Sequence, residues 1–255
     1  MAQRLETLEE LRDHLSGHLH VLVVLLSDSW GGLEQTALAD TRRLVKNGMK
    51  VSFLVRDGSP VDHVLQQESP HIRRVHSPRK VRNWLDFQFM QQIRELVDVD
   101  GVNLVHLHQT SLLGSVVPAL WGRRHVALAV SRHILNNHNK RDPLHALIYR
   151  RVDFLLVLSH TMRNNVVATF PVREKRVRTV NLGINVQRFN PNTVDRNVMR
   201  DEWGVAKDAF LVGVVGRLDP AKGQDVLVKA LPRVAHDIPE VMGVLVGNET
   251  PGLEG

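Results

Sequence analysis

Short runs of consecutive apolar residues alternate along the chain with longer stretches in which apolar residues recur every three or four positions. The first run, residues 18–27, has the length and composition of a strand that is buried on both faces. The amphipathic stretch after it opens at a Gly-Gly pair and closes at Gly48, which is typical of a helix. The same pattern predicts further strands at 49–58, 102–110, 125–133, 152–160 and 177–183, and helices at 112–121, 144–151 and from 161 onward.

Strands that alternate with helices predict an α/β fold, a Rossmann-like parallel sheet with helices on both faces. A short amphipathic helix within residues 1–16 leads into this pattern. We therefore assign residues 1–190 to one N-terminal domain. Because ligands of such sheets bind in the loops at the carboxyl ends of the strands, residues in those loops are the first candidates for a functional site.

The pattern weakens after residue 185 and then restarts. Residues 191–208 have few apolar positions and begin with Pro191, so we interpret them as a linker with an approach helix. Residues 209–255 hold one strand–helix–strand unit, with strands at 209–216 and 241–248 and a helix from 223 to 235. Since two strands and one helix bury too little to be stable alone, this segment either adds to the first sheet or is the truncated start of a second Rossmann-like domain.

Composition excludes several classes of protein. The 255 residues are 43% hydrophobic and 24% charged, an ordinary globular balance, and the longest apolar run, Val21–Leu26, is far too short to span a bilayer. The absence of cysteine excludes disulfides, a thiolate nucleophile and a cysteine metal site. The acidic, polar N-terminus does not resemble a secretory signal, so we expect a cytoplasmic location.

Part of the net charge of +6 is concentrated between Ser69 and Leu85, where five basic residues occur without an acidic one: Arg73, Arg74, Arg79, Lys80 and Arg82. The simplest interpretation is a solvated loop. The alternative is a surface that meets anionic lipid or a phosphorylated acceptor, with peripheral contact at the inner face of a membrane. The apolar residues of 84–97 would then face either a core or a membrane interface. Nucleic acid is disfavoured because few aromatic residues are interleaved with the basic ones.

Two glycine-containing loops have the composition of anion-binding sites. Gly31 and Gly32 allow backbone N–H groups to approach a ligand at the start of a helix, although a plain tight turn is the alternative. Arg217 and Lys222 follow Gly216 at the end of a strand, where they could neutralise a diphosphate instead of lying solvated on the surface. Neither loop matches the dinucleotide or the Walker pattern, since the third glycine is missing from the first and Lys222 precedes Gly223 in the second.

Three histidines lie on or after predicted strands. His106 and His108 alternate, so their side chains point to the same face, but no carboxylate cluster completes a metal site and we expect no metal. His108 either lines a cleft or is a hydrogen-bonded core histidine. His133 ends the strand at 125–133, with Arg132 and Asn136 near it, and is the stronger candidate for a functional residue.

Six segments in order resemble glycosyltransferase family 4, a group of retaining enzymes with two Rossmann-like domains in the GT-B arrangement. The match runs through most of the chain from His20 to Gly247, and the six segments read GGLEQTALADTRRLVKNGMKV, NLVHLH, AVSRH, RRVDFLLVLSHTMRNNV, VRTVNLGINVQRFNP and VGRLDPAKGQDVLVKAL. The last of these is the most diagnostic. The resemblance implies that residues 1–190 form the acceptor-side domain and that 209–255 begin the domain that binds the nucleotide sugar.

The resemblance also implies roles for individual residues. Gly216, Arg217 and Lys222, with Gly31 and Gly32, would bind the diphosphate of the donor. His133 would be the catalytic residue, which hydrogen-bonds the transferred sugar or its phosphate, while His108, Arg132 and Asn136 would line the cleft. The departing diphosphate would help to deprotonate the acceptor hydroxyl, so no protein base and no cofactor besides the nucleotide-diphosphate sugar is expected.

The family's Glu-x7-Glu motif, which lies downstream of the Arg/Lys motif, does not occur before Gly255, so we expect the chain to be a fragment. The predicted function is transfer of a hexose from a nucleotide sugar to a saccharide or lipid-linked acceptor, of the envelope polysaccharide or lipopolysaccharide type. The alternative is a non-catalytic or partner-dependent binding module. An unpaired edge of the second sheet would also favour self-association.

Overall fold

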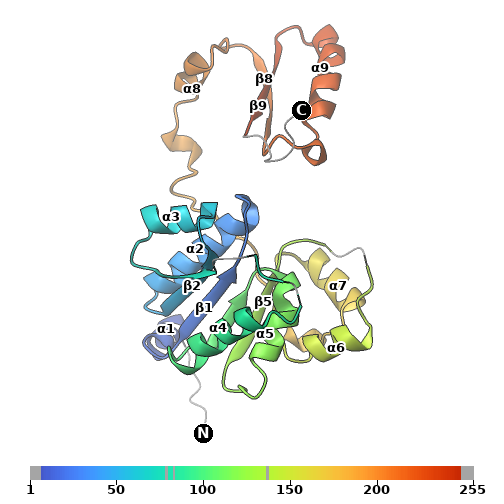
Figure 1. Ribbon diagram of the computed structural model, residues 1–255. Coiled ribbons are helices and arrows are strands. Elements are labelled where there is room, and N and C mark those ends of the chain that lie inside the picture. The colour runs from blue at the N-terminus through green and yellow to red at the C-terminus, as the bar shows by residue number, and fades with distance from the viewer. Residues whose placement is uncertain (1–6, 78–79, 83, 136–137, 248–255) are drawn as a thin grey trace. The chain divides into compact units, whose positions relative to one another are not determined.

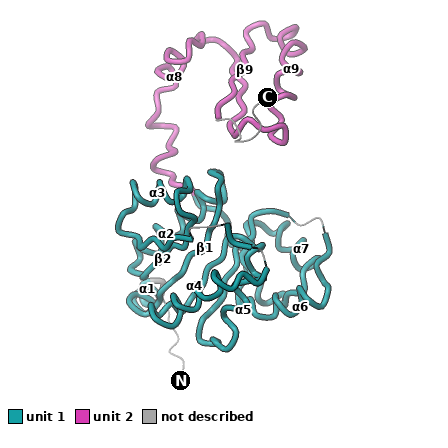
Figure 2. Tube along the Cα trace, in the orientation of Figure 1, with its two compact units in different colours: residues 1–183 teal, residues 184–255 magenta. Residues whose placement is uncertain are grey.

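The computed structural model describes residues 7–77, 80–82, 84–135 and 138–247. The chain forms two compact units, unit 1 (Met1–Gly183) and unit 2 (Ile184–Gly255) (Figure 1, Figure 2). Their division lies shortly before residue 190, which the sequence pattern predicts as the end of the first domain. Each unit is therefore described by itself.

Unit 1 is built on a seven-stranded parallel sheet in the order β3-β2-β1-β4-β5-β6-β7. The strands are β1 His20–Leu25, β2 Lys50–Arg56, β3 Arg73–Ser77, β4 Leu104–Leu107, β5 Ala127–Arg132, β6 Phe154–Val157 and β7 Val177–Thr179. This is the α/β, Rossmann-like sheet that the sequence predicts. The strand order reverses between β1 and β4, which is where ligands bind to such sheets.

Helices cover both faces of this sheet (Figure 1). They are α1 Leu8–Leu15, α2 Gly32–Lys46, α3 Pro60–Glu68, α4 Phe87–Asp98, α5 Leu113–Ala119, α6 Pro143–Tyr149 and α7 His160–Thr169, with 3-10 turns η1 Thr110–Leu112 and η2 Glu174–Arg176. None of the helices in the described residues is long and apolar enough to cross a bilayer.

The alternation of side chains along β1 shows how the two faces are filled. Val21, Val23 and Leu25 join a core beneath α2 and α3, while Leu22 and Val24 join a larger core beneath α4 to α7. All six positions of β1 are consequently buried, as expected of a central parallel strand.

The apolar residues of α4 contribute to the larger of these cores. Phe89, Met90, Ile93, Leu96 and Val97 are all buried on the same face of the helix. Of the two roles that the sequence allows for this stretch, a core or a membrane interface, the structure therefore shows the core for these five residues, whereas Trp84, Leu85 and Phe87 are exposed.

The first part of the basic stretch is not the solvated loop that its composition suggests, whereas Lys80 and Arg82 are exposed and lie outside helices and strands. Residues 73–77 form β3, an edge strand that pairs with β2, and it is preceded by a helix, α3, that the sequence pattern did not predict. Arg73 forms an ion pair with Asp100 at 2.8 Å, and Arg74 forms one with the buried Asp62 at 2.8 Å. The acids that offset this basic run come from other segments, so the local sequence does not show them. Arg79 lies outside the described residues.

Unit 2 is a single strand–helix–strand unit with an approach segment. It comprises η3 Pro191–Thr193, α8 Arg196–Glu202, β8 Phe210–Val215, η4 Pro220–Lys222, α9 Gln224–Asp237 and β9 Val241–Val246. In the described residues β8 and β9 pair only with each other, in parallel, so they do not add to the first sheet. The helix expected in the approach segment is α8.

Candidate functional site

The carboxyl edge of the unit 1 sheet holds polar atoms that are buried without a hydrogen-bond partner. Within the described part of the chain these atoms are Arg56 Nε, His108 Nε2, Arg132 Nε and Thr179 Oγ1. Three of them belong to the last residues of β2, β5 and β7, and His108 directly follows β4. Since a buried polar group without a partner costs about 1–3 kcal/mol, their concentration at one edge indicates a place that accepts a polar ligand.

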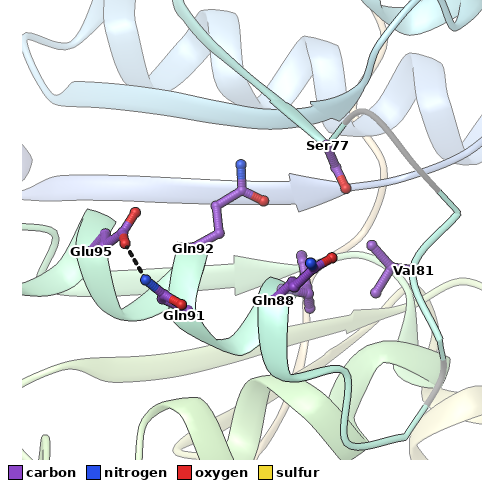
Figure 3. Close-up of a pocket in the computed structure, with 7 residues that line it drawn as sticks. Ser77, Val81, Gln88, Gln91, Gln92 and Glu95 are labelled. Atoms are coloured by element: carbon purple, nitrogen blue, oxygen red, sulfur yellow. Dashed lines mark hydrogen bonds between the residues drawn. The ribbon is translucent and has the colours of Figure 1, made fainter.

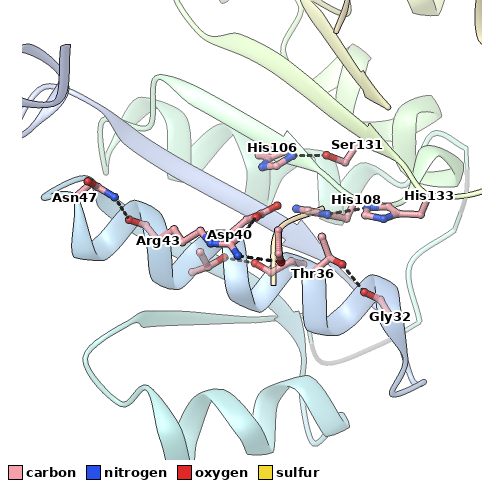
Figure 4. Close-up of polar contacts among 12 residues, drawn as sticks. Gly32, Thr36, Asp40, Arg43, Asn47, His106, His108, Ser131 and His133 are labelled. Carbon is pink, nitrogen blue, oxygen red and sulfur yellow. Dashed lines mark hydrogen bonds and ion pairs between the residues drawn. The ribbon is translucent and has the colours of Figure 1, made fainter. Parts of the chain in front are cut away.

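Three histidines form a connected set at the ends of β4 and β5 (Figure 4). His106 Nε2 lies 2.8 Å from Ser131 Oγ, and His108 Nδ1 lies 3.3 Å from His133 Nε2. The rings of His106 and His108 are 4.2 Å apart between centroids. Because Val105 and Leu107 point into the core beneath α4 to α7, the two β4 histidines share the opposite face, on the side of α2. The spacing of the two residues predicts this shared face.

Burial keeps this set neutral. It lowers the pKa of His106 to about 4 and that of His108 well below its usual range. Burial also lowers the pKa of His133, although Asp40 and Glu34 on α2 partly oppose that shift. At neutral pH each ring therefore carries one N–H donor and one lone-pair acceptor.

The acids of α2 belong to the site, although the sequence pattern did not single them out. Burial raises the pKa of Asp40 against the opposing effect of Arg43, which pairs with it at 3.0 Å. Glu34 is buried in the first turn of α2 and accepts a hydrogen bond from Ser27 Oγ at 2.6 Å. Its position three residues after Gly31 is the signal that could have shown it, since acids favour the first turn of a helix.

The carboxylate of Glu34 lies close to the glycine loop. A Cβ atom on Gly31 would lie 3.4 Å from Glu34 Oε2, whereas a Cβ on Gly32 would meet nothing within 4 Å. A carboxylate thus already lies at the positive end of α2, and a phosphate bound at Gly31 and Gly32 would share that end with it. Binding of a diphosphate by these glycines stays a prediction.

A cavity of about 250 Å³ lies on the other side of the same edge. It is lined by Trp84, Thr110, Ser111, Leu113, Gly114, Lys140, His145, Ile148 and Tyr149. Lys140 Nζ lies 5.7 Å from the centre of the buried Phe170 ring, and the guanidinium of Arg132 lies over the same ring at 4.6 Å. Arg132 therefore faces the side of this cavity, while His133 faces α2. Asn136, the remaining residue predicted to line the cleft, lies outside the described residues.

A second cavity, of about 330 Å³, lies between the end of β3 and α4 (Figure 3). Its polar lining consists of Ser77, Gln88, Gln91, Gln92 and Glu95, with Val81 and Phe89 completing it. It adjoins the outermost strand, away from the point between β1 and β4 where the strand order reverses. It is therefore a weaker candidate than the edge that holds the histidines.

Unit 2 presents its cations at the carboxyl end of β8. Arg217 is half-buried and Lys222 is exposed at the end of η4, and no acidic side chain in residues 184–247 forms an ion pair with either. Gln224 Nε2 donates to the Arg217 carbonyl at 2.7 Å and fixes the loop. A Cβ on Gly247 would clash with the Gly216 carbonyl oxygen, so the ends of β8 and β9 approach too closely for any other residue.

The sequence model of Glycosyltransferase Family 4 matches residues 30–188. The chain belongs to glycosyltransferase family 4. Two similar relatives are D-inositol 3-phosphate glycosyltransferases, from a Nocardioides species (23% identity, 88% of this chain and 55% of the relative) and from Catenulispora acidiphila (24% identity, 81% and 53%). This family 4 chain spans about half the length of those relatives.

Solved glycosyltransferase structures share the fold of this family 4 chain. A glycosyltransferase from Rickettsia africae superposes with a TM-score of 0.75 at 17% identity, over 90% of this chain and 60% of its own. Anabaena HepE, crystallised in complex with UDP and glucose, gives 0.68 at 20% identity, over 92% and 62%. These similarities confirm the Rossmann-like, GT-B class of fold that the sequence motifs predict.

One further group of side chains in the family 4 chain has the spacing of a metal site. Asp57, Asp62 and His76 bring ligand atoms within 4.8 Å of one another. Asp62 accepts hydrogen bonds from Arg74 at 2.8 Å and His76 at 3.0 Å, and these bonds together lower its pKa although burial opposes them. Because an arginine already neutralises the central carboxylate, this group has the partners of an ion-pair network. The alternative metal pair, His106 and His108, instead bonds to Ser131 and His133.

Proposed function

We propose that the chain is part of a glycosyltransferase that moves a hexose from a nucleotide-diphosphate sugar to a saccharide or lipid-linked acceptor. The observation that supports this most is the pair Arg217 and Lys222, which lie close to Gly216 in this family 4 chain. Neither cation has an ion-pair partner among residues 184–247. Arginine binds a diphosphate bidentately and lysine adds a point charge. The nucleotide sugar is the substrate, and the proposal includes no other cofactor and no metal.

The nucleotide is open within this proposal. Anabaena HepE was crystallised with UDP, whereas a Mycolicibacterium smegmatis relative, 37% identical over 65 residues, is a GDP-mannose-dependent mannosyltransferase. Arg217 and Lys222 would contact the diphosphate that both donors share. A donor screen therefore has to include uridine and guanosine diphosphate sugars.

We further propose that the cavity beside Trp84 and Lys140 binds a hydroxylated acceptor that carries an anionic group. The indole of Trp84 is 44% exposed and offers an apolar face for a sugar ring, while Lys140 forms no ion pair within the described residues. Burial raises the pKa of Tyr149 to about 12, so its hydroxyl remains a donor at neutral pH.

The backbone around Trp84 supports this use. Leu85 has φ of 46°, a left-handed conformation that a leucine adopts at a cost of about 1–3 kcal/mol. The strain persists because Leu85 N donates to the Gly114 carbonyl and Asp86 N donates to Ser115 Oγ. These bonds fix the segment that presents the indole to the cavity, as expected of a binding site and not of a loose loop.

The chemistry follows from these groups. Arg217 and Lys222 would stabilise the diphosphate as it leaves, and His133 would donate a hydrogen bond to the transferred sugar or its phosphate. The leaving oxygen would accept the acceptor's proton, so catalysis would be positioning and electrostatic support.

The test uses the full chain with UDP-glucose, UDP-N-acetylglucosamine and GDP-mannose, with binding measured by calorimetry and transfer to D-inositol 3-phosphate measured by mass spectrometry. We expect one donor to bind, and Lys140→Ala to weaken binding of the acceptor but not of the donor. Donor binding without turnover would favour the alternative, a partner-dependent binding module. Failure to bind any of the donors would contradict the proposal.

Peripheral contact with an anionic membrane, at its cytoplasmic face, is a separate proposal that rests on the basic stretch and on the lipopolysaccharide type of acceptor. The charge-reversal test varies Lys80 and Arg82, which are both exposed. The variant Lys80→Glu with Arg82→Glu should bind phosphatidylserine vesicles more weakly than the unaltered chain. Equal binding of the vesicles by the variant and the unaltered chain would contradict this proposal.

Self-association through the β8–β9 sheet is a separate prediction, which sedimentation of the same samples would test.

A further inference from the structure

His108 occupies the centre of the histidine set and is the most completely buried member of it, at 3% exposure. Its Nδ1 lies 3.3 Å from His133 Nε2, and its ring lies against that of His106. Its other nitrogen, Nε2, is buried and has no partner among the described residues. His133 is half-buried, and no described residue forms a hydrogen bond with its Nδ1 (Figure 4).

Two arrangements of protons satisfy the bond between the neutral rings of His108 and His133. If His133 Nε2 donates, the proton of His108 must lie on Nε2, where it is a buried N–H without an acceptor. If His108 Nδ1 donates, the unpaired atom of His108 is only a lone pair. Unpaired buried N–H groups are rarer in proteins than acceptors with a free lone pair, so the second arrangement costs less.

We infer that His108 is a positioning residue, which donates its Nδ1–H to His133 Nε2 and so holds His133 as the neutral Nδ1–H tautomer. The free N–H of His133 is then the group that meets the substrate, as a hydrogen-bond donor. The link to a substrate oxygen rests on the proposed function, whereas the tautomer does not.

The surroundings of His133 agree with a neutral donor. The acids that face it are Glu34 and Asp40 on α2, and Asp40 is itself paired with Arg43. A proton added to His133 Nε2 would force the proton of His108 onto its buried Nε2, which has no partner in the described part of the chain. The network therefore opposes protonation of His133 in addition to burial, and disfavours a role as general base.

The decisive experiment is nitrogen NMR of the full chain labelled with ¹⁵N-histidine, with His133 assigned by its loss in His133→Gln. We expect an Nδ1–H signal for His133 in the unaltered chain and a mixture of tautomers in His108→Leu. His108→Asn, whose amide nitrogen replaces Nδ1, should restore the original tautomer. His63→Leu, at an exposed histidine on α3, is the matched control and should change nothing at His133.

An Nε2–H signal for His133 in the unaltered chain would overturn the inference, as would an unchanged tautomer in folded His108→Leu. If His108→Leu fails to fold, loss of the Nδ1–H tautomer in His108→Asn would overturn it equally. Once a donor is known, His108→Leu should lower kcat about 10- to 100-fold with little change in KM, as expected when a group that orients a transition-state donor is lost. His108→Asn should recover most of this loss. Absence of turnover with the expected tautomers would contradict only the proposed function.

Discussion

Units 1 and 2 use the same strand–helix–strand element and bury it to very different degrees. Every position of β1 is buried, whereas no position of β8 or β9 is. The difference arises because β1 has a strand on each side and helices on both faces, while β8 has one partner strand in the described residues. An apolar run thus predicts a strand, but neighbouring elements decide whether that strand contributes a core.

The candidate chemistry follows the same division. The unit 1 groups, His106, His108 and Arg132, are held by a filled core and include polar atoms without partners among the described residues. The unit 2 groups, Arg217 and Lys222, lie in a loop beside a sheet with little burial. We therefore expect changes of packing and pH to act mainly on unit 1, and loss of a cation to act on ligand binding by unit 2.

The largest expected effect is on packing. Phe53 is fully buried in the core beneath α2 and α3, so Phe53→Ala should lower the free energy of unfolding of unit 1 by about 3–5 kcal/mol. Val215→Ala at the end of β8, where the side chain is 81% exposed, should change stability by less than about 0.5 kcal/mol. Denaturant unfolding of each variant, compared with the unaltered chain, measures both changes. Comparable losses in the two variants would mean that β8 is buried in solution.

The next effect is the dependence of stability on pH. The pKa of His106 is about 4 in the folded chain against 6.5 unfolded, because of burial. The unfolded state thus binds the proton first, and stability that is complete above pH 6.5 is lost as pH falls towards 4. Because of His106 alone, the free energy of unfolding of unit 1 should fall by up to about 3 kcal/mol over this range. The lowered pKa values of His20, His108 and His133 act in the same direction.

Two controls sharpen the pH prediction. His106→Gln keeps a donor near Ser131 without titrating, so the variant should lose a large part of the pH dependence between 6.5 and 4. Unit 2 has no buried histidine among its described residues, so its free energy of unfolding should depend less on pH in this range. Equal pH dependence of the two units would contradict the assignment to the buried histidines.

Much of the fold could be predicted because its elements are marked locally. The strand β1 is a continuous apolar run after His20, β2 and β5 are mainly apolar, and α2 is bounded by Gly31 and Gly48, so periodicity and breakers suffice. β3 could not be predicted in this way. Its residues, RRVHS, carry the charge of a loop, and what holds them in a strand is pairing with β2 and acids from distant segments.

For the candidate site, too, the sequence predicts what local spacing determines and not what contacts between distant segments determine. His106 and His108 could be placed on one face from their spacing, and the ends of parallel strands could be expected to meet at one edge. The bond from His108 to His133, and the position of Asp40 beside His133, depend on the registers of β4 and β5 and on how α2 lies over them. No local pattern in the sequence specifies those contacts.

The smallest of these effects tests unit 2 directly. Loss of a hydrogen bond to a charged group costs about 1.5–3 kcal/mol, so Arg217→Ala should weaken binding of the donor identified in the screen by about 10- to 100-fold. Lys222→Ala should act less, because the ammonium of Lys222 is exposed and its charge is screened by solvent. Lys229→Ala is the matched control, since Lys229 is an exposed lysine of α9 that is already paired with Asp225 at 3.0 Å. Calorimetry of the three variants gives the ranking. If Lys229→Ala weakens binding as much as Arg217→Ala, the donor is attracted by net charge alone, and the loop after β8 is no more a diphosphate site than the rest of a basic surface.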